Sequence, residues 1–406
     1  MKILHLFANW KWTGPAEPAL AVAQVQCADH DVLFVSGSSP GGSPSKILPY
    51  IEARQVPTLD GFHLSKHARF RANREDVRSA IELLKRFQPD IVHTHLDNDH
   101  RIASQAVRAT GIGCLVRTSY DPVGLSGTMR TRRIVRRSLD GLIVTTNSGW
   151  DGTLAAYGGS SRSVSVRGYP VPMVLIENGI DLVRFDASRF DRTEQRKKMG
   201  LADDEVAIGI VARVQPHRRF DLLLAAMQRV VADHPQLRLV VIGRGTHIQR
   251  LLLDPIEAMG LSDYVRSTGY IEGDNYPGAL CALDGTLFLV PGTDGTCRAL
   301  REQMALGLPP IVTPRTPLPE IVEEGTSGLV VEETVDGMAR GLARLAGADG
   351  LRQRLGAGAL KAARQRFDTG IQAQLVTEFY GQVLDEVAKR KARAAASAKA
   401  RSQEPV

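Results

Sequence analysis

The sequence predicts an α/β protein built from two doubly wound, Rossmann-like domains. The chain has 406 residues, a length typical of two domains rather than one. Short runs that are apolar on both faces alternate with helical patterns, as expected for parallel sheets covered by helices on both sides. A polar segment at 181–204 interrupts this alternation, which then begins again. Ligands are expected at the carboxyl ends of the strands and in a cleft that the two domains face.

The first domain is expected to span residues 1–183. Its predicted strands, in order, are KILHLFA, DVLFVSG, DIVHTH, GCLVRT, GLIVTT and MVLIENG, with helical patterns such as EDVRSAIELLKRF between them. The second domain is expected at 184–368. Its predicted strands are EVAIGIVAR, LRLVVIG, YVRSTGY, GTLFLVPG, LPPIVTP and GLVVEE. Residues 369–396 indicate an amphipathic helix that crosses back to the first domain, and 397–406 a disordered tail rich in Ala, Lys and Arg.

The composition is that of a soluble globular protein, with 43% hydrophobic and 23% charged residues. No apolar run reaches the roughly 18 residues that a membrane-spanning helix needs. The first residues, MKILHLFANW, suit a buried strand better than a signal peptide. The cysteines show no disulfide or metal-type spacing; they are Cys27, Cys114, Cys281 and Cys297. A cytoplasmic protein with reduced thiols is the simplest expectation.

The net charge of +7 points to an anionic partner. The run from Met129 to Leu139 predicts a basic amphipathic helix that carries Arg132, Arg133, Arg136 and Arg137. Such a helix fits an anionic membrane surface, which would make the protein peripheral on the inner face of the cytoplasmic membrane. A solvated face beside a core stripe remains an alternative. Nucleic acid is disfavoured, because aromatic residues make up only 5% of the chain and stacking platforms are scarce.

Basic residues follow the first predicted strand of the second domain. Arg213 lies at the end of this strand, and Arg218 and Arg219 precede the next helix. A guanidinium group binds phosphate through a planar, bidentate fork. A basic loop that only faces water is the alternative. In the first domain, Gly14 ends the loop after the first strand and permits close approach of a ligand, unless it is a plain tight turn.

A second candidate anion site lies in the stretch DGTCRALREQMALGLP, which begins at Asp294. The amides of Gly295, Thr296, Cys297 and Arg298 are expected to point out of a helix start, where the helix dipole favours an anion. Cys297, Leu300 and Met304 share the core stripe, so Glu302 lies off that stripe and can face a ligand. The alternative is that Arg298 and Glu302 form an ordinary i,i+4 pair.

In these motifs the chain resembles the retaining glycosyltransferases of family 4, which have the GT-B fold. VLIENGIDLVRF resembles the interdomain segment of that family, and ARVQPHRRFDLLL resembles its basic loop. The stretch from Thr293 to Val331 resembles the family's segment that runs from an acidic pair to a Gly-Leu-Pro turn. The order and spacing of these motifs cover nearly the whole chain. The resemblance makes the first domain the acceptor domain and the second the nucleotide-sugar donor domain.

The resemblance implies roles for individual residues. Arg213 and Arg218 would bind the donor diphosphate, Glu302 the ribose hydroxyls and Asp294 the hydroxyls of the donor sugar. The other implied donor-binding residues are Gly14, Gly295, Thr296, Cys297 and Arg298. The implied reaction is hexosyl transfer from a nucleoside-diphosphate sugar to a hydroxyl acceptor, such as a lipid-linked or cell-surface glycan in polysaccharide biosynthesis, with retained anomeric configuration. No cofactor and no metal would be needed, because arginines and helix amides neutralise the leaving diphosphate.

The chain departs from the family pattern at several implied site positions. Asp294 replaces a glutamate, and Arg219 replaces a glycine. Cys297 and Arg298 replace small or apolar residues. Tyr120, in LVRTSYDP, stands where the family has an active-site histidine. A tyrosine donates a hydrogen bond but is a poor base near pH 7. Together with Asp294 and Glu302, Tyr120 completes the expected catalytic set.

Two rival functions remain open. The substitutions at 120 and 294 are compatible with a GT-B protein that binds nucleotide sugars without transferring them, or with an epimerase. The run HTHLDNDH suggests a metal-dependent hydrolase that would use His93, His95, Asp97, Asp99 and His100. Asn98 stands where the motif of such hydrolases needs a histidine.

Overall fold

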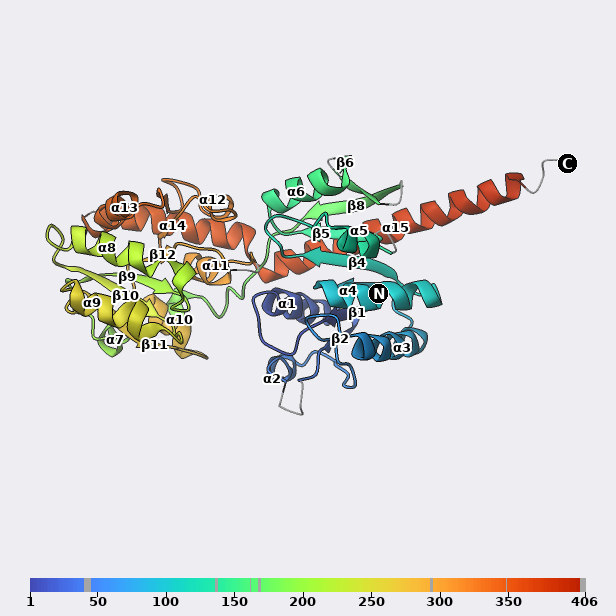
Figure 1. Cartoon of the computed structure of the whole chain (residues 1–406), viewed down its shortest axis with the longest axis horizontal. Coiled ribbons are helices and arrows are strands. Elements are labelled where there is room, and N and C mark those ends of the chain that lie inside the picture. The colour runs from blue at the N-terminus through green and yellow to red at the C-terminus, as the bar shows by residue number, and fades with distance from the viewer. Residues whose placement is uncertain are drawn as a thin grey trace. The chain divides into compact units, whose positions relative to one another are not determined.

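The computed structural model describes residues 1–39, 45–135, 138–160, 162–166, 169–292, 295–347 and 349–401. The chain divides into two compact α/β units (Figure 1). Unit 1 comprises Met1–Gly179 and the residues from Thr369 on, and unit 2 comprises Ile180–Asp368. The predicted fold class, two doubly wound domains with parallel sheets, is confirmed. The division falls after Gly179, a few residues before the expected boundary at 183.

The sheet of unit 1 has the strand order β2-β1-β3-β4-β5-β8-β7-β6. Its parallel strands are β1 (Lys2–Phe7), β2 (Asp31–Ser36), β3 (Ile91–Thr94), β4 (Cys114–Ser119), β5 (Gly141–Val144) and β8 (Tyr169–Leu175). Two short antiparallel strands, β6 (Gly159–Ser160) and β7 (Ser163–Val166), extend one edge. The sequence analysis missed this extension, although Ser and Val alternate along β7 with the period of a half-buried strand.

The helices of unit 1 cover both faces of this sheet. They are α1 (Ala16–Gln26), α2 (Leu48–Ala53), α3 (Phe70–Phe87), α4 (Asp97–Thr110), α5 (Met129–Val135), α6 (Asn147–Tyr157) and α15 (Thr369–Arg401). Helix α15 returns from the end of unit 2 and buries Phe379 and Val383 in the core beside α1. Gly141 in β5 permits this packing, because a Cβ there would lie 2.5 Å from Val383 Cγ2.

The end of α15 corrects one expectation. The helix continues to Arg401 instead of ending at 396, because Ala, Lys and Arg are strong helix formers. Of the expected disordered tail at 397–406, residues 402–406 lie outside the described residues.

The sheet of unit 2 is parallel throughout, with the order β11-β10-β9-β12-β13-β14. The strands are β9 (Val206–Val211), β10 (Leu237–Ile242), β11 (Val265–Gly269), β12 (Gly285–Phe288), β13 (Pro310–Val312) and β14 (Leu329–Val330). The helices are α7 (Arg192–Lys198), α8 (Phe220–Val230), α9 (Asp254–Ala258), α10 (Asn275–Cys281), α11 (Arg298–Ala305), α12 (Leu318–Ile321), α13 (Val335–Gly347) and α14 (Asp349–Arg366).

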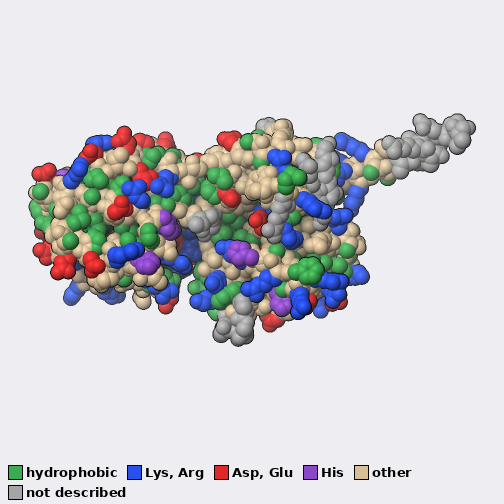
Figure 2. Space-filling view, viewed as in Figure 1, with side chains coloured by type: hydrophobic (Ala, Val, Ile, Leu, Met, Phe, Trp, Pro, Cys, Tyr) green, Lys and Arg blue, Asp and Glu red, His purple; other side chains and the backbone are tan. Residues whose placement is uncertain are grey.

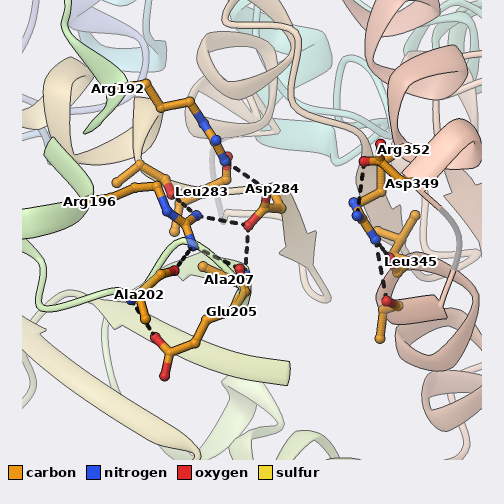
Figure 3. Close-up of polar contacts among 12 residues, drawn as sticks. Arg192, Arg196, Ala202, Glu205, Ala207, Leu283, Asp284, Leu345, Asp349 and Arg352 are labelled. Atoms are coloured by element: carbon orange, nitrogen blue, oxygen red, sulfur yellow. Dashed lines mark hydrogen bonds and ion pairs between the residues drawn. The ribbon is translucent and has the colours of Figure 1, made fainter. Parts of the chain in front are cut away.

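A buried arginine ties the polar segment that precedes β9 to the amino edge of this sheet (Figure 3). Arg196, in α7, donates hydrogen bonds to Asp284 Oδ2 at 3.1 Å and to the carbonyl of Ala282 at 3.0 Å. The same carboxylate oxygen accepts the amide of Ala207 at 2.8 Å. The charge of Arg196, which is only 3% exposed, is therefore paired, as a buried charge requires. This network holds the edge opposite to the candidate site.

Candidate functional site

The loop after β9 places two of the candidate arginines at the carboxyl edge of the unit 2 sheet. Arg213 is exposed, whereas Arg218 is partly buried. The Nη1 atom of Arg218 donates a hydrogen bond to the carbonyl of Val290 at 2.7 Å. Because Val290 follows β12, this bond holds the basic loop against the loop that leads to α11. The structure thus brings Arg218 to the same edge of the sheet as the second candidate anion site.

Arg219 does not crowd this loop. Its backbone has φ of 59°, in the left-handed region that favours glycine, which is the residue at this place in the resembled motif. Its side chain turns to Glu333, with Nη1 and Oε1 separated by 2.6 Å. Arg315 pairs with the same carboxylate, and these partners lower the pKa of Glu333. The ion pairs thus direct the guanidinium of Arg219 to Glu333.

The Gly-Arg-Gly turn after β10 serves close packing of two loops. A Cβ on Gly243 would lie 2.0 Å from the carbonyl oxygen of Ala212, and one on Gly245 would lie 2.1 Å from that of Val214. The amide of Val214 also donates to the carbonyl of Arg244 at 3.2 Å. Only glycine allows this approach, so the turn fixes the backbone on both sides of Arg213.

The start of α11 differs in part from the expected ring of outward amides. The amide of Gly295 donates to the carbonyl of Gly292 at 3.1 Å, so this amide is used inside the loop. Thr296 and Cys297 are each 3% exposed, and Cys297 has φ of 45°. Arg301, which the sequence analysis missed, is also buried and donates through Nη1 to the carbonyl of Thr296. Asp294 lies outside the described residues.

Glu302 is buried. Its Oε1 is 2.9 Å from Nε of Arg298, so the i,i+4 pair is formed, and its Oε2 accepts a hydrogen bond from the hydroxyl of Tyr276 at 3.1 Å. Burial, and then the charge of Glu302, raise the pKa of Tyr276 well above its usual value. The ring of Phe185, from the resembled interdomain segment, packs edge-on against Tyr276 with centroids 6.0 Å apart. The carboxylate therefore has a fixed orientation.

Tyr276 is a site residue that sequence reasoning missed. It lies in α10, in the segment DNYPG, where an aromatic residue between turn formers gives no signal of a site. Its hydroxyl reaches Glu302 of α11 only in the folded unit. Cys297, Leu300 and Met304 form the buried stripe of α11, as predicted.

The implied site residues of unit 1, Gly14 and Tyr120, lie at the carboxyl edge of its own sheet. Gly14 is in the turn between β1 and α1, where the amide of Ala16 donates to the carbonyl of Thr13 at 3.0 Å. Tyr120 directly follows β4 and is 6% exposed. Its hydroxyl is 3.0 Å from Nδ1 of His95, inside the unit.

Tyr120 belongs to a chain of buried hydrogen bonds whose direction can be derived. The amide of Gln26 donates to Thr377 at 3.0 Å, so its carbonyl oxygen faces Nε2 of His5 at 2.9 Å and accepts that proton. Burial lowers the pKa of His5 to about 4, so the ring is neutral and its Nδ1 accepts from Nε2 of His95. His95 is neutral too, because burial lowers its pKa, and its Nδ1 accepts the Tyr120 proton.

The constellation expected for a metal hydrolase is not assembled. Asp97 pairs with Arg117, and Asp99 accepts the backbone amides of Ala8 and Leu96. His100 bonds instead to Thr94 Oγ1 at 3.0 Å. The side chains therefore point to different partners, and the run HTHLDNDH serves the internal structure of unit 1.

His93 and His95 lie instead beside His5, and their candidate ligand atoms are all within 4.8 Å. The ring nitrogens of His93 already bond to Tyr380 at 2.6 Å and to Thr118 at 2.8 Å. This group fits a hydrogen-bond network better than a metal site.

The predicted basic helix forms α5, which ends at Val135. Arg132 donates through Nη2 to the carbonyl of Ala156, at the end of α6, at 2.6 Å. Arg133 is exposed, and Arg136 and Arg137 lie outside the described residues. One of the four arginines expected on a membrane surface therefore also serves to hold α6. Within the described ranges, no helix combines the length and apolar character that crossing a bilayer requires.

The two Rossmann-like units are those of the GT-B fold. Solved structures that share it include Anabaena HepE in complex with UDP, with 19% identity, a TM-score of 0.75, and coverage of 94% of this chain and 100% of that one. A glycosyltransferase from Rickettsia africae aligns with 15% identity and a TM-score of 0.77, over 94% of this chain and 98% of that one. These likenesses establish the fold.

Residues 191–362 match the family model described as glycosyl transferases, group 1. The D-inositol 3-phosphate glycosyltransferase of Actinosynnema mirum is 30% identical over 53% of this chain and 53% of its own length. The lipopolysaccharide core biosynthesis mannosyltransferase of Rhizobium meliloti is 32% identical over 40% of this chain and 46% of its own. The chain spans about half the length of the curated relatives it matches. The fold and the family match together support a glycosyltransferase of the GT-B class.

Proposed function

We propose that this protein is a family 4, retaining glycosyltransferase that moves a sugar from a nucleoside-diphosphate sugar to a hydroxyl group. One observation carries the proposal. The carboxyl edge of the unit 2 sheet brings together a basic loop, held by Arg218 at Val290, and the start of α11 with its fixed Glu302. Both features lie within the residues that match the glycosyl transferase model.

The charges at this edge suit a donor diphosphate. Arg213 and Arg218 supply cations where two strands end, and α11 adds the positive end of its dipole. In the proposed step the bond between the anomeric carbon and the diphosphate oxygen breaks, and the acceptor oxygen bonds to the same face of that carbon. The acceptor proton passes to the departing diphosphate. Arginines that are already in place stabilise the developing negative charge without a metal ion.

Glu302 is proposed to bind the ribose hydroxyls of the donor. An ionised carboxylate accepts about four hydrogen bonds. Arg298 and Tyr276 fix the plane of this carboxylate from two sides. A site residue whose rotamer is locked in this way contributes affinity with less loss of conformational entropy on binding.

The proposed acceptor is a lipid-linked or cell-surface glycan, reached by a cytoplasmic protein that lies on the inner membrane surface. The relatives support this class of acceptor: one is named for the lipopolysaccharide core, and another, from Corynebacterium glutamicum, for a phosphatidylinositol monomannoside. The exposed Arg133 of α5 supports contact with an anionic surface.

A thermal-shift panel of UDP, GDP, ADP and dTDP, with and without EDTA, tests the donor site. A ligand present at 100 times its dissociation constant adds about 2.7 kcal/mol to stability. We expect one diphosphate to raise the melting temperature selectively, with no effect of EDTA. If no nucleotide stabilises the protein, the proposal is wrong. A rise that EDTA abolishes and Mg²⁺ restores would overturn the metal-independent mechanism.

Product analysis separates transfer from the rival functions. With the selected nucleotide sugar, a transferase releases the nucleoside diphosphate in proportion to glycosylated acceptor. An epimerase interconverts two nucleotide sugars when no acceptor is present. A binding protein forms neither product. Retention of the anomeric configuration is read from the coupling constant of the anomeric proton in the product.

A further inference from the structure

We propose that a basic groove in unit 1 binds the phosphate headgroup of an anionic membrane lipid. The groove lies between α3, α4 and α5 and has a volume of about 1240 Å³. The inference deepens the proposed function, on which it rests, because it names the surface that would hold the enzyme on the membrane of its acceptor.

The groove is lined by cations from all three helices. Its arginines are Arg69, Arg74, Arg101, Arg132 and Arg133, and none of the described lining residues is acidic. Arginine is suited to phosphate, since its planar fork donates two parallel hydrogen bonds. Figure 2 shows many Lys and Arg side chains on the part of the surface where Figure 1 places α3, α4 and α5.

Three arginines of the groove carry charges that no described acid neutralises. Among the described residues, no acid forms an ion pair with Arg69, Arg74 or Arg133, and all three are exposed. Exposed arginines of unit 2 behave differently; Arg340, for example, pairs with Glu332. Arg69, Arg74 and Arg133 are therefore available to an external anion.

The floor of the groove is rigid. The side chain of Asn73 accepts the backbone amide of Arg69 at 2.9 Å and donates to Asn98 Oδ1 at 2.7 Å. Asn98 in turn donates to the carbonyl of Ser65 at 2.8 Å. These bonds fix the first turn of α3 on α4, so the backbone that carries Arg69 and Arg74 is held in place.

Two large apolar side chains favour a lipid over a soluble phosphate. Phe70 is 84% exposed and Met129 is 83% exposed, and both line the groove. Exposed apolar side chains beside a ring of cations are the pattern of proteins that lie in the interface of an anionic bilayer. The arginines would bind the phosphate while Phe70 and Met129 enter the boundary of the acyl chains.

The groove lies near the carboxyl edge of the unit 1 sheet. Helix α4 begins at Asp97, just after β3 ends at Thr94, and α3 ends at Phe87, just before β3 begins. Both helices therefore start at the carboxyl edge of the sheet, where doubly wound proteins bind their ligands. The groove and Tyr120 share this edge.

Vesicle flotation of the full chain tests the proposal. The probes are vesicles of phosphatidylcholine alone and of phosphatidylcholine with 30 mol% (about a third) phosphatidylglycerol, a mixture with a negative surface potential. We expect binding to the anionic vesicles only. The variant Arg69→Gln/Arg74→Gln/Arg133→Gln is expected to bind them at least about tenfold more weakly. The matched control is Arg78→Gln/Arg86→Gln/Arg108→Gln, which removes as many exposed arginines of α3 and α4 away from the groove.

Each other outcome overturns the inference. Equal losses in the two triple variants would show an effect of net charge alone, and wild-type binding by the groove variant would exclude the groove. A soluble occupant would be indicated if glycerol 3-phosphate bound the groove and Phe70→Ser/Met129→Ser left vesicle binding unchanged. UDP and GDP binding, measured on the same variants, tests the donor site separately. If the wild-type protein bound neither UDP nor GDP, the proposed function would be refuted. Vesicle binding would still test the groove.

Discussion

The hydroxyl of Tyr120 lies 3.0 Å from Nδ1 of His95 and donates its proton to that ring, inside unit 1. Burial, and then the charges of Asp99 and Tyr380, raise the pKa of this phenol well above its usual value. In this arrangement the proton of Tyr120 is bonded to His95, and the raised pKa keeps the phenol protonated near pH 7. Its expected catalytic role stays a prediction, and its geometry is that of a residue that positions the loop after β4.

Replacing Tyr120 with Phe is expected to destabilise the protein by about 1–3 kcal/mol, because it leaves the buried Nδ1 of His95 without a donor. The measurement is the free energy of unfolding in urea. Tyr157→Phe is the control, since the hydroxyl of Tyr157 bonds to Ser126 at an exposed position, where water can replace it. Unchanged stability together with lost turnover would instead show that the Tyr120 hydroxyl acts on the substrate.

The buried histidines are expected to make the protein less stable as the pH falls from 7 to 5. Burial lowers the pKa of His5, His93, His95 and His100, so near pH 6.5 the unfolded chain binds protons that the folded chain does not. Each such proton contributes about 1.4 kcal/mol per pH unit in this window. The contribution of these neutral histidines to the free energy of unfolding is therefore present above about pH 6.5 and is lost progressively below it.

Buried carboxyl groups oppose this trend. Burial raises the pKa of Asp99 to about 7 and also raises that of Asp76, so the folded chain retains protons there that the unfolded chain releases above about pH 4. The histidines outnumber these carboxyls, so the net slope stays positive. Urea unfolding at pH 5, 6 and 7 measures how the free energy of unfolding changes with pH. The control is His67→Gln, because His67 is exposed. A flat or inverted slope would mean that the network takes up protons while folded.

Arg213→Ala is expected to weaken binding of the selected nucleoside diphosphate at least tenfold, or about 1.4 kcal/mol, because it removes a charge-assisted hydrogen bond to phosphate. The fold should persist, since Arg213 is exposed. Calorimetric titration gives the affinity, and Arg250→Ala, an exposed arginine elsewhere in unit 2, is the control. Unchanged affinity in Arg213→Ala would refute the diphosphate assignment.

Glu302→Gln is expected to weaken binding of the whole nucleotide about tenfold or more, while inorganic diphosphate binds as before. The glutamine side chain has one oxygen that accepts hydrogen bonds, because its nitrogen only donates. It therefore cannot accept from Arg298, Tyr276 and the ribose as the carboxylate does. Glu257→Gln, at an exposed position in α9, is the control. Equal losses for nucleotide and diphosphate would place Glu302 in the general charge balance of the site rather than at the ribose.

The sequence could predict what depends on local periodicity. Buried strands such as β5 and β9 are continuous apolar runs, and the stripe of Leu300 and Met304 follows from helical spacing. The order of such runs was sufficient for the fold class. The strand β7 was not predicted, because its alternating pattern is short and polar. The arginines at the start of α3, Arg69 and Arg74, were not predicted as a binding surface, because the run of arginines in α5 is denser.

The sequence by itself determined the two parallel sheets, the arginines at the end of β9 and the residues at the start of α11. Only the tertiary structure decided which side chains meet. Tyr276 reaches Glu302 from another helix, and His5, His95 and Tyr120 form one network although three different segments supply them. The physical reason is that periodicity reports which face of an element is buried, whereas hydrogen-bond partners depend on how distant elements pack. A polar side chain in a buried strand, such as His5, reveals its role only when its partner is in place.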